Sequence, residues 1–351
     1  MKLTLNSLSQ LAALEVDEII DVRSSAEFAE DHVPGAVNLP VLSNEERAEV
    51  GTIYVQDSRF RARRLGAAHV ARNASRHLET HLKDKDGSYR PLVYCWRGGM
   101  RSGSFASILE QVGWRVSLLE GGYQSYRRLV HKALYEEVLN VPVVVLDGNT
   151  GTAKTDLLHR LAERGCQVID LEGLANHRGS VFGARPGGQP VQKAFESALA
   201  MELVRLDPAR PVVVEAESSK IGNRTIPPAL WTAMRAAPRV FVAAPVAERA
   251  RYLARAYADV AADLDALIGV IDKLAGLQSN ETLEHWRELA RNGALEDLAR
   301  ELMEIHYDPR YRKQRDRADG GVERVLEVTD LSEAGLDVAA DRLAAVLRDI
   351  G

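Results

Sequence analysis

The sequence predicts an α/β protein with two parallel-sheet domains and a helical C-terminal part. Short apolar runs typical of buried strands alternate with helix-period segments from the N-terminus, and the alternation restarts at Val141. Two of these runs end in glycine-rich loops, CWRGG after PLVY and GNTGTAKT after VPVVVL. Because functional loops of α/β proteins gather at the carboxyl ends of parallel strands, these two loops are the first candidates for a site.

Composition supports a folded protein and excludes several classes. The chain has 351 residues, enough for two domains, with 46% hydrophobic and 27% charged residues. Its net charge is −5, so a nucleic-acid surface must be a local basic patch. With only Cys95 and Cys166, neither a disulfide framework nor a cysteine-rich zinc site is available. Short apolar runs and a signal-free N-terminus predict a cytoplasmic protein without a membrane partner.

The first half reads as one domain over residues 1–128 with an insertion. Strand signals are VDEIIDVRS, PGAVNLP, PLVYCWRGG and WRVSLLEGG, and SAEFAEDH and RSGSFASILEQVG are helical. Between them, residues 43–90 form a basic, helical insertion. A linker helix is expected over 129–140.

The second half, 141–351, is expected to be a P-loop-like domain. Strand signals recur in VPVVVLDG, CQVIDLEG, RPVVVEAES and PRVFVAAP. After about residue 246 we expect strands to stop and helices to dominate.

The loop CWRGGMR is a candidate for covalent chemistry at Cys95. Its backbone N–H groups can point at an anion, and Arg97, Gly98, Gly99 and Arg101 are the candidate anion-binding residues. A helix start and nearby arginines favour the thiolate, which is the nucleophilic form of cysteine. The alternative is a buried thiol without chemistry.

The loop GNTGTAKT has the spacing of a phosphate-binding loop. Gly148 and Gly151 allow tight turns, Lys154 neutralises the anion, and Thr155 can bind an oxygen or ligate Mg²⁺. Ala153 stands where glycine is common, and its methyl group is tolerated if φ is negative. The glutamates at 215 and 217 stand where an ATPase commonly offers an aspartate, so the loop need not hold ATP.

Other polar residues form two further sets of candidates. Two loops near the phosphate loop supply possible site residues, with His177 as a candidate general base and metal binding not expected: Glu172, His177, Arg178, Ser180, Glu215, Glu217 and Ser218. Two basic stretches with interleaved aromatic residues can bind tRNA phosphates and stack bases, although a solvated charged face is the alternative. Their candidate residues are Arg59, Arg61, Arg63, Arg64, Tyr307, Arg310, Tyr311 and Arg312.

Three stretches resemble the rhodanese family in its characteristic order: DVRSSAEFAEDHVPGAVNLP (21–40), YCWRGGMRS (94–102) and LLEGGYQSYRR (118–128). The resemblance implies that Cys95 carries transferable sulfur or selenium and that the loop amides hold an anionic donor. It also implies that Asp21 and Arg23 brace this loop.

Nearly the whole chain resembles the family of tRNA 2-selenouridine synthases, through CWRGGMRS, GNTGTAKT, EGLANHRGSVFG, EAESSKIG and YDPRY in order. The resemblance implies S-geranylation of wobble 2-thiouridine by geranyl diphosphate, then replacement of the geranylthio group with selenium from selenophosphate. The implied tRNAs are those for Lys, Glu and Gln, and Gly66 matches the glycine that the family associates with the geranyl step.

The expected partners and alternatives complete the sequence-based interpretation. No tightly bound cofactor is expected, the two donors are substrates, and whether Mg²⁺ binds the phosphate loop stays open. We expect a monomer that receives selenophosphate from a supplying enzyme. One alternative is a sulfurtransferase fused to an ATP-dependent kinase or ATPase, which would turn over nucleotide. Another is a non-catalytic tRNA-binding anion sensor, in which Cys95 only helps to form an anion pocket.

Overall fold

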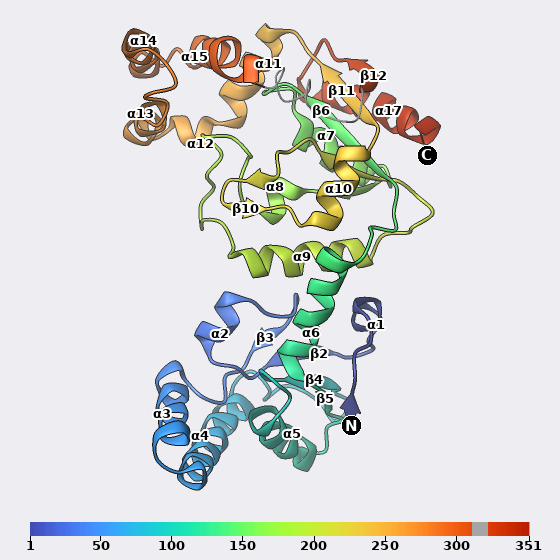
Figure 1. The fold of residues 1–351 in the computed structure, drawn as a ribbon, viewed down its shortest axis with the longest axis vertical. Coiled ribbons are helices and arrows are strands. Elements are labelled where there is room, and N and C mark those ends of the chain that lie inside the picture. The colour runs from blue at the N-terminus through green and yellow to red at the C-terminus, as the bar shows by residue number, and fades with distance from the viewer. Residues whose placement is uncertain (311–321, 351) are drawn as a thin grey trace. The chain divides into compact units, whose positions relative to one another are not determined.

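The computed structural model describes residues 1–310 and 322–350. Two of the tRNA-binding candidates, Tyr311 and Arg312, therefore lie outside the described residues. The chain divides into two compact units, which Figure 1 shows with their elements labelled. Residues 1–137 and 191–205 form the first unit, and residues 138–190 and 206–351 form the second.

The first unit contains a five-stranded sheet in which every pairing is parallel, as predicted. Its strand order is β1-β5-β4-β2-β3, and all four residues of β4 are buried. This central strand carries Cys95 directly after its last residue. The strands are β1 (Lys2–Leu3), β2 (Glu18–Asp21), β3 (Val37–Asn38), β4 (Pro91–Tyr94) and β5 (Ser117–Leu119).

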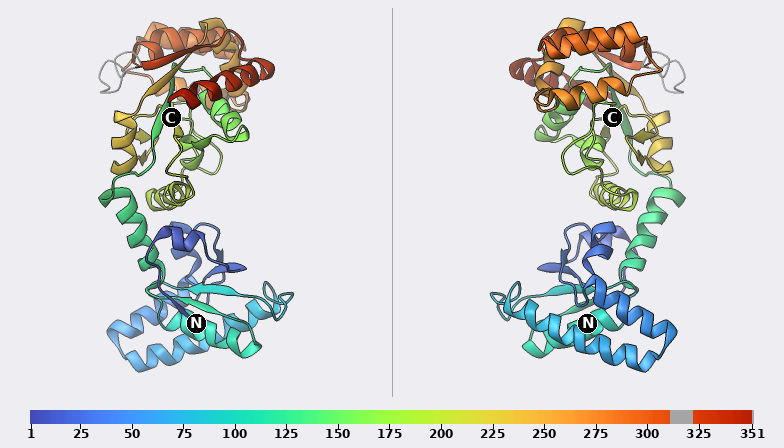
Figure 2. Two further views of the ribbon diagram at one scale, coloured as in Figure 1. Left: turned by 90° about the vertical axis from the view of Figure 1, so that its right-hand side faces the viewer. Right: turned by 90° about the vertical axis from the view of Figure 1, so that its left-hand side faces the viewer.

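Helices flank this sheet in two groups, as Figures 1 and 2 show. Helices α4 and α5 pack against each other, and α1, α6 and α9 make a second packed group. The expected linker helix is α6 followed by a π-helical turn, η1. The elements are α1 (Leu8–Ala12), α2 (Ser25–Glu30), α3 (Asn44–Gln56), α4 (Arg59–Glu79), α5 (Met100–Val112), α6 (Gly122–His131), η1 (Lys132–Glu136) and α9 (Gln192–Val204).

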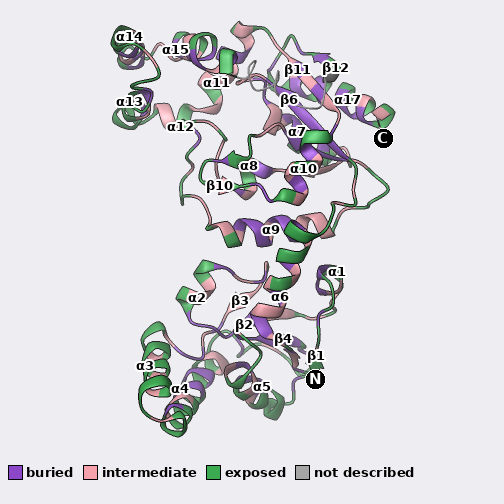
Figure 3. Ribbon diagram, viewed as in Figure 1, coloured by how far each residue is buried: buried purple, intermediate pink, exposed green. Residues whose placement is uncertain are grey.

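The predicted insertion is a hairpin of α3 and α4. Ser43 caps α3 through a reciprocal pair of bonds with Glu46, and the Ser58 hydroxyl accepts from the backbone of Arg61 at the start of α4. Helix α3 has no buried residue, as its exposed surface in Figure 3 shows, whereas α4 buries one stripe. The hairpin therefore presents most of its polar side chains to solvent.

The second unit contains another five-stranded parallel sheet, in the order β12-β11-β6-β8-β7. The prediction that strands stop after residue 246 is wrong, because β12 pairs with β11 at the sheet edge. The strands are β6 (Val143–Gly148), β7 (Gln167–Ile169), β8 (Val212–Glu215), β11 (Arg239–Ala243) and β12 (Val322–Glu327). A two-stranded ribbon is added by β9 (Lys220–Ile221) and β10 (Arg224–Thr225).

The helices of the second unit include a C-terminal group near the phosphate loop. Helix α17 packs on α7, and α11 packs on α15 within the helical group that Figures 1 and 2 show in orange. The helices are α7 (Lys154–Glu163), α8 (Leu171–Leu174), α10 (Pro228–Ala236), α11 (Val246–Ala256), α12 (Ala258–Ala261), α13 (Leu264–Asp272), α14 (Asn280–Arg291), α15 (Leu295–Glu301), the π-helical turn η2 (Leu302–Tyr307) and α17 (Glu333–Ile350).

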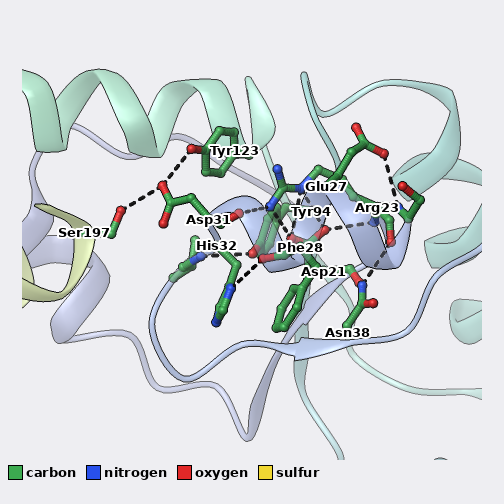
Figure 4. Close-up of polar contacts among 12 residues, drawn as sticks. Asp21, Arg23, Glu27, Phe28, Asp31, His32, Asn38, Tyr94, Tyr123 and Ser197 are labelled. Atoms are coloured by element: carbon green, nitrogen blue, oxygen red, sulfur yellow. Dashed lines mark hydrogen bonds and ion pairs between the residues drawn. The ribbon is translucent and has the colours of Figure 1, made fainter. Parts of the chain in front are cut away.

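Helix α9 departs from the expected domain division. We expected residues 141–351 to form one domain, but residues 191–205 pack with the first unit. Figure 4 shows the buried carboxylate of Asp31 accepting hydrogen bonds from Ser197 of α9 at 2.9 Å and from Tyr123 at 2.7 Å. Arg127 also pairs with Glu196 of α9. The first unit therefore includes a helix that follows the phosphate loop in sequence.

Candidate functional site

The phosphate loop lies between β6 and α7, as its sequence predicts. Gly151 has φ +84°, and a Cβ there would lie 3.0 Å from the carbonyl oxygen of Arg249, so only glycine fits. Ala153 has φ 57° and ψ 33°, which is left-handed. The methyl group of Ala153 was expected to be tolerated if φ were negative, and φ is positive. This backbone conformation therefore costs about 1–2 kcal/mol relative to a right-handed one. The Lys154 ammonium donates to the Gly148 carbonyl at 3.0 Å.

A polar cavity of about 330 Å³ opens beside this loop. It brings together loops that follow β6, β7 and β8, whose carboxyl ends lie at one edge of the sheet. Seven of its lining residues were predicted from the sequence: Gly151, Lys154, Thr155, Glu172, Arg178, Ser180 and Glu217. Sequence reasoning missed Arg185, Arg255 and Tyr257, which also line the cavity. Arg185 lies just beyond the polar stretch 171–183 that indicated this region, so a longer window would have included it.

Four cationic side chains line the cavity, namely those of Lys154, Arg178, Arg185 and Arg255. Arg178 lies over the Tyr257 ring at 4.7 Å and donates to Asp259 at 2.9 Å. Because these charges converge on one cavity next to a phosphate-binding loop, the cavity suits a multiply charged anion.

Two glutamates share the cavity with the cations. Thr155 donates its hydroxyl proton to Glu172 at 3.1 Å. Burial, followed by the charge of Glu172, raises the pKa of Glu217 to about 8, and burial also raises the pKa of Glu172. At neutral pH Glu217 is therefore protonated, which reduces its repulsion of an anion.

Among the residues predicted in the phosphate loop and its two neighbouring loops, four do not line this cavity: Gly148, His177, Glu215 and Ser218. Nδ1 of His177 accepts from the Gly179 amide at 3.1 Å, and burial lowers the pKa of its imidazole. Ser218 is exposed and donates to the Lys220 carbonyl at 2.6 Å. These positions give no support to His177 as general base in the cavity.

Glu215 is part of the support of the site rather than of its lining. It ends β8, is 1% exposed, and accepts from the backbone of Leu171 at 3.1 Å. Its other carboxyl oxygen has no hydrogen-bond partner among the described residues, and burial followed by the charge of Glu172 raises the pKa of Glu215 well above the ordinary value. Glu215 therefore holds the start of α8, which carries Glu172.

A buried ion pair fixes the other side of the phosphate loop. Arg249 of α11 donates to both carboxyl oxygens of Asp308, at 3.0 and 2.8 Å. The same guanidinium donates to the carbonyl oxygen of Thr150, within the loop, at 3.0 Å. No sequence motif indicated this arrangement, since 59 residues separate Arg249 from Asp308.

The cysteine loop lies in the first unit, between β4 and α5. Sγ of Cys95 is buried and accepts from the Gly99 amide at 3.3 Å and the Ser102 hydroxyl at 3.2 Å. Gly98 has φ +64°, and a Cβ there would lie 2.6 Å from the Leu119 carbonyl oxygen. The loop thus directs two hydrogen-bond donors at the sulfur of Cys95.

The two arginines of this loop have protein partners. Arg101 donates to Glu27 at 2.7 and 3.2 Å, so its charge is directed at that carboxylate. Burial would raise the pKa of Glu27, but Arg101 lowers it to about 2. Arg97 is exposed and donates to Gln124 at 3.1 Å. Direct anion binding by either arginine would require these partners to be exchanged.

The pair of Asp21 and Arg23 lies directly behind the cysteine loop. Arg23 donates to Asp21 at 2.6 Å and to the Asp31 carbonyl at 2.6 Å, as Figure 4 shows. Its guanidinium lies 4.1 Å from the Tyr123 ring centroid and 5.8 Å from that of Trp96, which follows Cys95. Through these contacts Arg23 supports the residue that follows Cys95 and the ring of Tyr123.

The insertion hairpin carries the remaining candidates of the first unit. Gly66 lies on α4, where an added Cβ would meet Val50 of α3 at 3.5 Å. Four arginines at the start of α4, Arg59, Arg61, Arg63 and Arg64, are exposed, as are Tyr54 and Phe60 beside them. Arg61 pairs with Asp57, and Arg59 lies 5.5 Å from the Tyr54 ring centroid.

The other described tRNA-binding candidates belong to the second unit. Arg310 is exposed and contacts His306. Tyr307 is only partly exposed and lines an apolar cavity, so its ring is not part of an exposed stacking surface.

Two further kinds of site are absent from residues 1–310 and 322–350. In this part of the chain, no group of three or more His, Cys, Asp and Glu side chains is arranged to hold a metal ion. The same residues include no helix long and apolar enough to cross a bilayer.

The fold and the two loops define a class of protein in which a rhodanese-like domain precedes a P-loop-like domain. The rhodanese-like domain profile matches residues 4–129, and the profile of the tRNA 2-selenouridine synthase AAA domain matches residues 141–333. A tRNA 2-selenouridine synthase of Alcanivorax borkumensis is 33% identical over 322 residues, covering 84% of this chain and 88% of that protein. One of Aeromonas salmonicida is 38% identical over 255 residues, covering 71% and 67%. The chain belongs to the tRNA 2-selenouridine synthase family.

Proposed function

We propose that this chain converts the wobble 2-thiouridine of a tRNA to 2-selenouridine through an S-geranylated intermediate. The observation that carries the proposal is the combination, in a member of this family, of a thiol held by loop donors with a cation-lined cavity beside a phosphate loop. The first suits a group-transfer step, and the second suits a phosphorylated donor. Cytoplasmic tRNAs for Lys, Glu and Gln are the proposed substrates.

In the first step, the sulfur of 2-thiouridine attacks C1 of geranyl diphosphate. The S–C1 bond forms, the C1–O bond breaks, diphosphate leaves, and the base loses its N3 proton. Lys154, Arg178, Arg185 and Arg255 line the cavity in which negative charge grows on the leaving group. The product is a thioether whose sulfur can leave as geranyl thiol, whereas the thiocarbonyl sulfur of 2-thiouridine is a poor leaving group.

In the second step, selenium from selenophosphate adds to C2 and geranyl thiol departs. Water attacks phosphorus, so the P–Se bond breaks and phosphate is released. The selenium stays on C2, and N3 regains a proton. We assign Cys95 and its loop to this step, because the Gly99 amide and the Ser102 hydroxyl direct hydrogen bonds at Sγ. Selenophosphate would come from a supplying enzyme.

Magnesium would bind at the start of α7 in this scheme. Thr155 and Glu172 would hold the ion, since their oxygens lie 3.1 Å apart at the start of α7. The ion would supply charge neutralisation for the diphosphate. Without the ion, the four cationic side chains of the cavity neutralise the diphosphate.

Mass spectrometry of nucleosides tests the proposal. Thiolated tRNA is incubated with the full chain, geranyl diphosphate and selenophosphate, without ATP. We expect geranylated 2-thiouridine when selenophosphate is omitted and 2-selenouridine when both donors are present. A requirement for nucleotide turnover would favour the sulfurtransferase–ATPase alternative, and an unchanged uridine mass would favour a binding module.

A further inference from the structure

A second cavity of the same unit is apolar and has no part in the site described so far. Its volume is about 80 Å³, and it lies among α11, α13, α15 and η2. The side chains that form its walls include Phe182, Leu253, Leu267, Leu298, Leu302 and Met303.

This apolar cavity adjoins the polar cavity at the phosphate loop. Four residues line both: Thr150, Ser180, Leu253 and Tyr257. Thr150 belongs to the phosphate loop itself. The two cavities therefore share part of their walls beside the phosphate loop.

The ion pair of Arg249 and Asp308 joins the two cavities physically. Arg249 donates to the Thr150 carbonyl at 3.0 Å and lies 3.6 Å from the sulfur of Met303, which lines the apolar cavity. One buried group thus contacts the polar rim and the apolar wall, and the flexible Met303 side chain can adapt to an occupant.

We propose that the two cavities form one composite site for the diphosphate ester of a branched, isoprenoid-type alcohol, with its hydrocarbon tail in the apolar cavity. This assignment rests on the proposed alkyl diphosphate donor and deepens it by locating the tail. It also separates the roles of the units: the tail is recognised by the helical group around α11 to η2, in the same unit as the phosphate loop.

The lining argues against a nucleotide in the same place. The polar lining residues are the shared Thr150, Ser180 and Tyr257 together with Tyr307, and the remaining described lining residues are apolar. A nucleobase needs several hydrogen-bond partners when it is buried, whereas a hydrocarbon needs none. Burial of a tail here gains affinity from the hydrophobic effect.

The volume sets an expected tail length. An apolar cavity of about 150 Å³ accepts one benzene molecule. By the same proportion, the cavity of about 80 Å³ has room for about three carbon atoms at the end of the tail, while the rest of the tail lies at the shared rim. A ten-carbon tail should fit better than a five-carbon tail, which leaves the cavity empty, or a fifteen-carbon tail, which overfills it.

Calorimetric titration of the full chain tests the composite site. The probes are inorganic, dimethylallyl, geranyl and farnesyl diphosphate. Wild type should bind geranyl diphosphate on the order of 100-fold more tightly than inorganic diphosphate, from about four-fold for each buried carbon. It should also prefer the geranyl ester to both other esters.

Two matched substitutions locate the tail. Ala299→Phe fills the apolar cavity and should reduce the advantage of geranyl over inorganic diphosphate to below about 10-fold, with inorganic diphosphate binding unchanged. Ala262→Phe, at an exposed residue outside the lining, should keep that advantage. If Ala299→Phe fails to fold, Ala261→Leu fills the same cavity with a smaller group.

The outcomes separate this inference from the proposed function. Equal geranyl diphosphate affinity in wild type and in a folded cavity-filling variant would overturn the composite site, even if tRNA were geranylated. Tight binding of geranyl diphosphate that is lost in the filled variant would support the site, even if the tRNA nucleoside mass did not change. The second result would contradict only the proposed reaction.

Discussion

At the scale of single residues, Cys95 has the contacts that a reactive thiol needs, and Cys166 does not. Cys95→Ser should abolish selenium incorporation, by at least about 100-fold, because an alcohol is a far weaker nucleophile and anion than a thiol. Geranylated tRNA should accumulate, since the first step uses the other unit. Nucleoside mass spectrometry measures both products.

The control for this prediction is Cys166→Ser. Burial raises the pKa of the Cys166 thiol, and no loop of donors surrounds it among the contacts of the described residues. This variant should incorporate selenium as wild type does. Undiminished selenation by Cys95→Ser would remove the role assigned to the thiol.

Glu217 gives the phosphate-loop cavity a predictable pH dependence. Because the pKa of Glu217 is raised to about 8, its carboxyl group is neutral at pH 7 and becomes charged as the pH rises through 8. A new negative charge beside a bound anion should weaken inorganic diphosphate binding about fivefold between pH 7 and pH 9. Calorimetry at several pH values measures this loss.

Glu217→Gln is the matched variant, since the amide keeps the shape and stays neutral. Its diphosphate affinity should change less over the same pH range, whatever the titration of diphosphate itself contributes to both proteins. Parallel pH profiles for wild type and variant would show that another group is responsible.

At the scale of elements, Arg249 connects α11, the phosphate loop and the residue that follows η2. Arg249→Met should destabilise the protein by about 3–5 kcal/mol, because it leaves Asp308 buried without its partner. It should also weaken diphosphate binding, since the Thr150 carbonyl loses its donor. Urea unfolding and calorimetry measure the two effects.

Arg251→Met on the same helix provides the comparison. Arg251 is exposed and pairs with Glu248, and such surface pairs contribute roughly 0–1 kcal/mol. A loss in Arg249→Met no larger than that in Arg251→Met would mean that the buried pair does not hold the loop.

The elements also show how far sequence patterns reach. Strands β4, β6 and β8 were predictable because a parallel strand buried on both faces is a continuous apolar run. Strand β12 was missed because VERVLE lacks strict alternation: its apolar residues recur at helical spacing, and it lies at a sheet edge next to helical segments. The pattern of a half-buried edge strand is weak in such a context.

The candidate site likewise contains residues that local sequence patterns indicate and contacts that they do not. Loops that directly follow strands were predictable, and so were Lys154, Glu172 and Glu217. The unusual Ala153 was visible in the sequence, but its left-handed backbone was not. Arg249 with Asp308, and Asp31 with Ser197, are pairs 59 and 166 residues apart, and no local pattern encodes contacts at such separations.

At the scale of the whole molecule, the two units are interleaved in sequence. The chain leaves the first unit at Glu137, forms the phosphate loop, returns for residues 191–205, and leaves again. A boundary near residue 141 therefore does not separate two independent folding units. Asp31, 2% exposed, would lose the Ser197 hydroxyl if α9 were absent, and Arg127 would lose Glu196.

A pair of fragments tests this dependence. Residues 1–137 alone should unfold at a temperature roughly 5–10 °C lower than the same residues joined by a Gly/Ser linker to residues 191–205. The expected difference follows from about 2 kcal/mol for one buried hydrogen bond to a charged group and one partly buried ion pair. Circular dichroism on heating gives the two midpoints.

A third fragment carrying Glu196→Ala and Ser197→Ala in the appended helix should lose most of the gain, because it keeps the helix but lacks both polar partners. If the first two fragments melted at the same temperature, α9 would be only a passive covering of the first unit; the expected difference would make it a required part of the unit that holds Cys95.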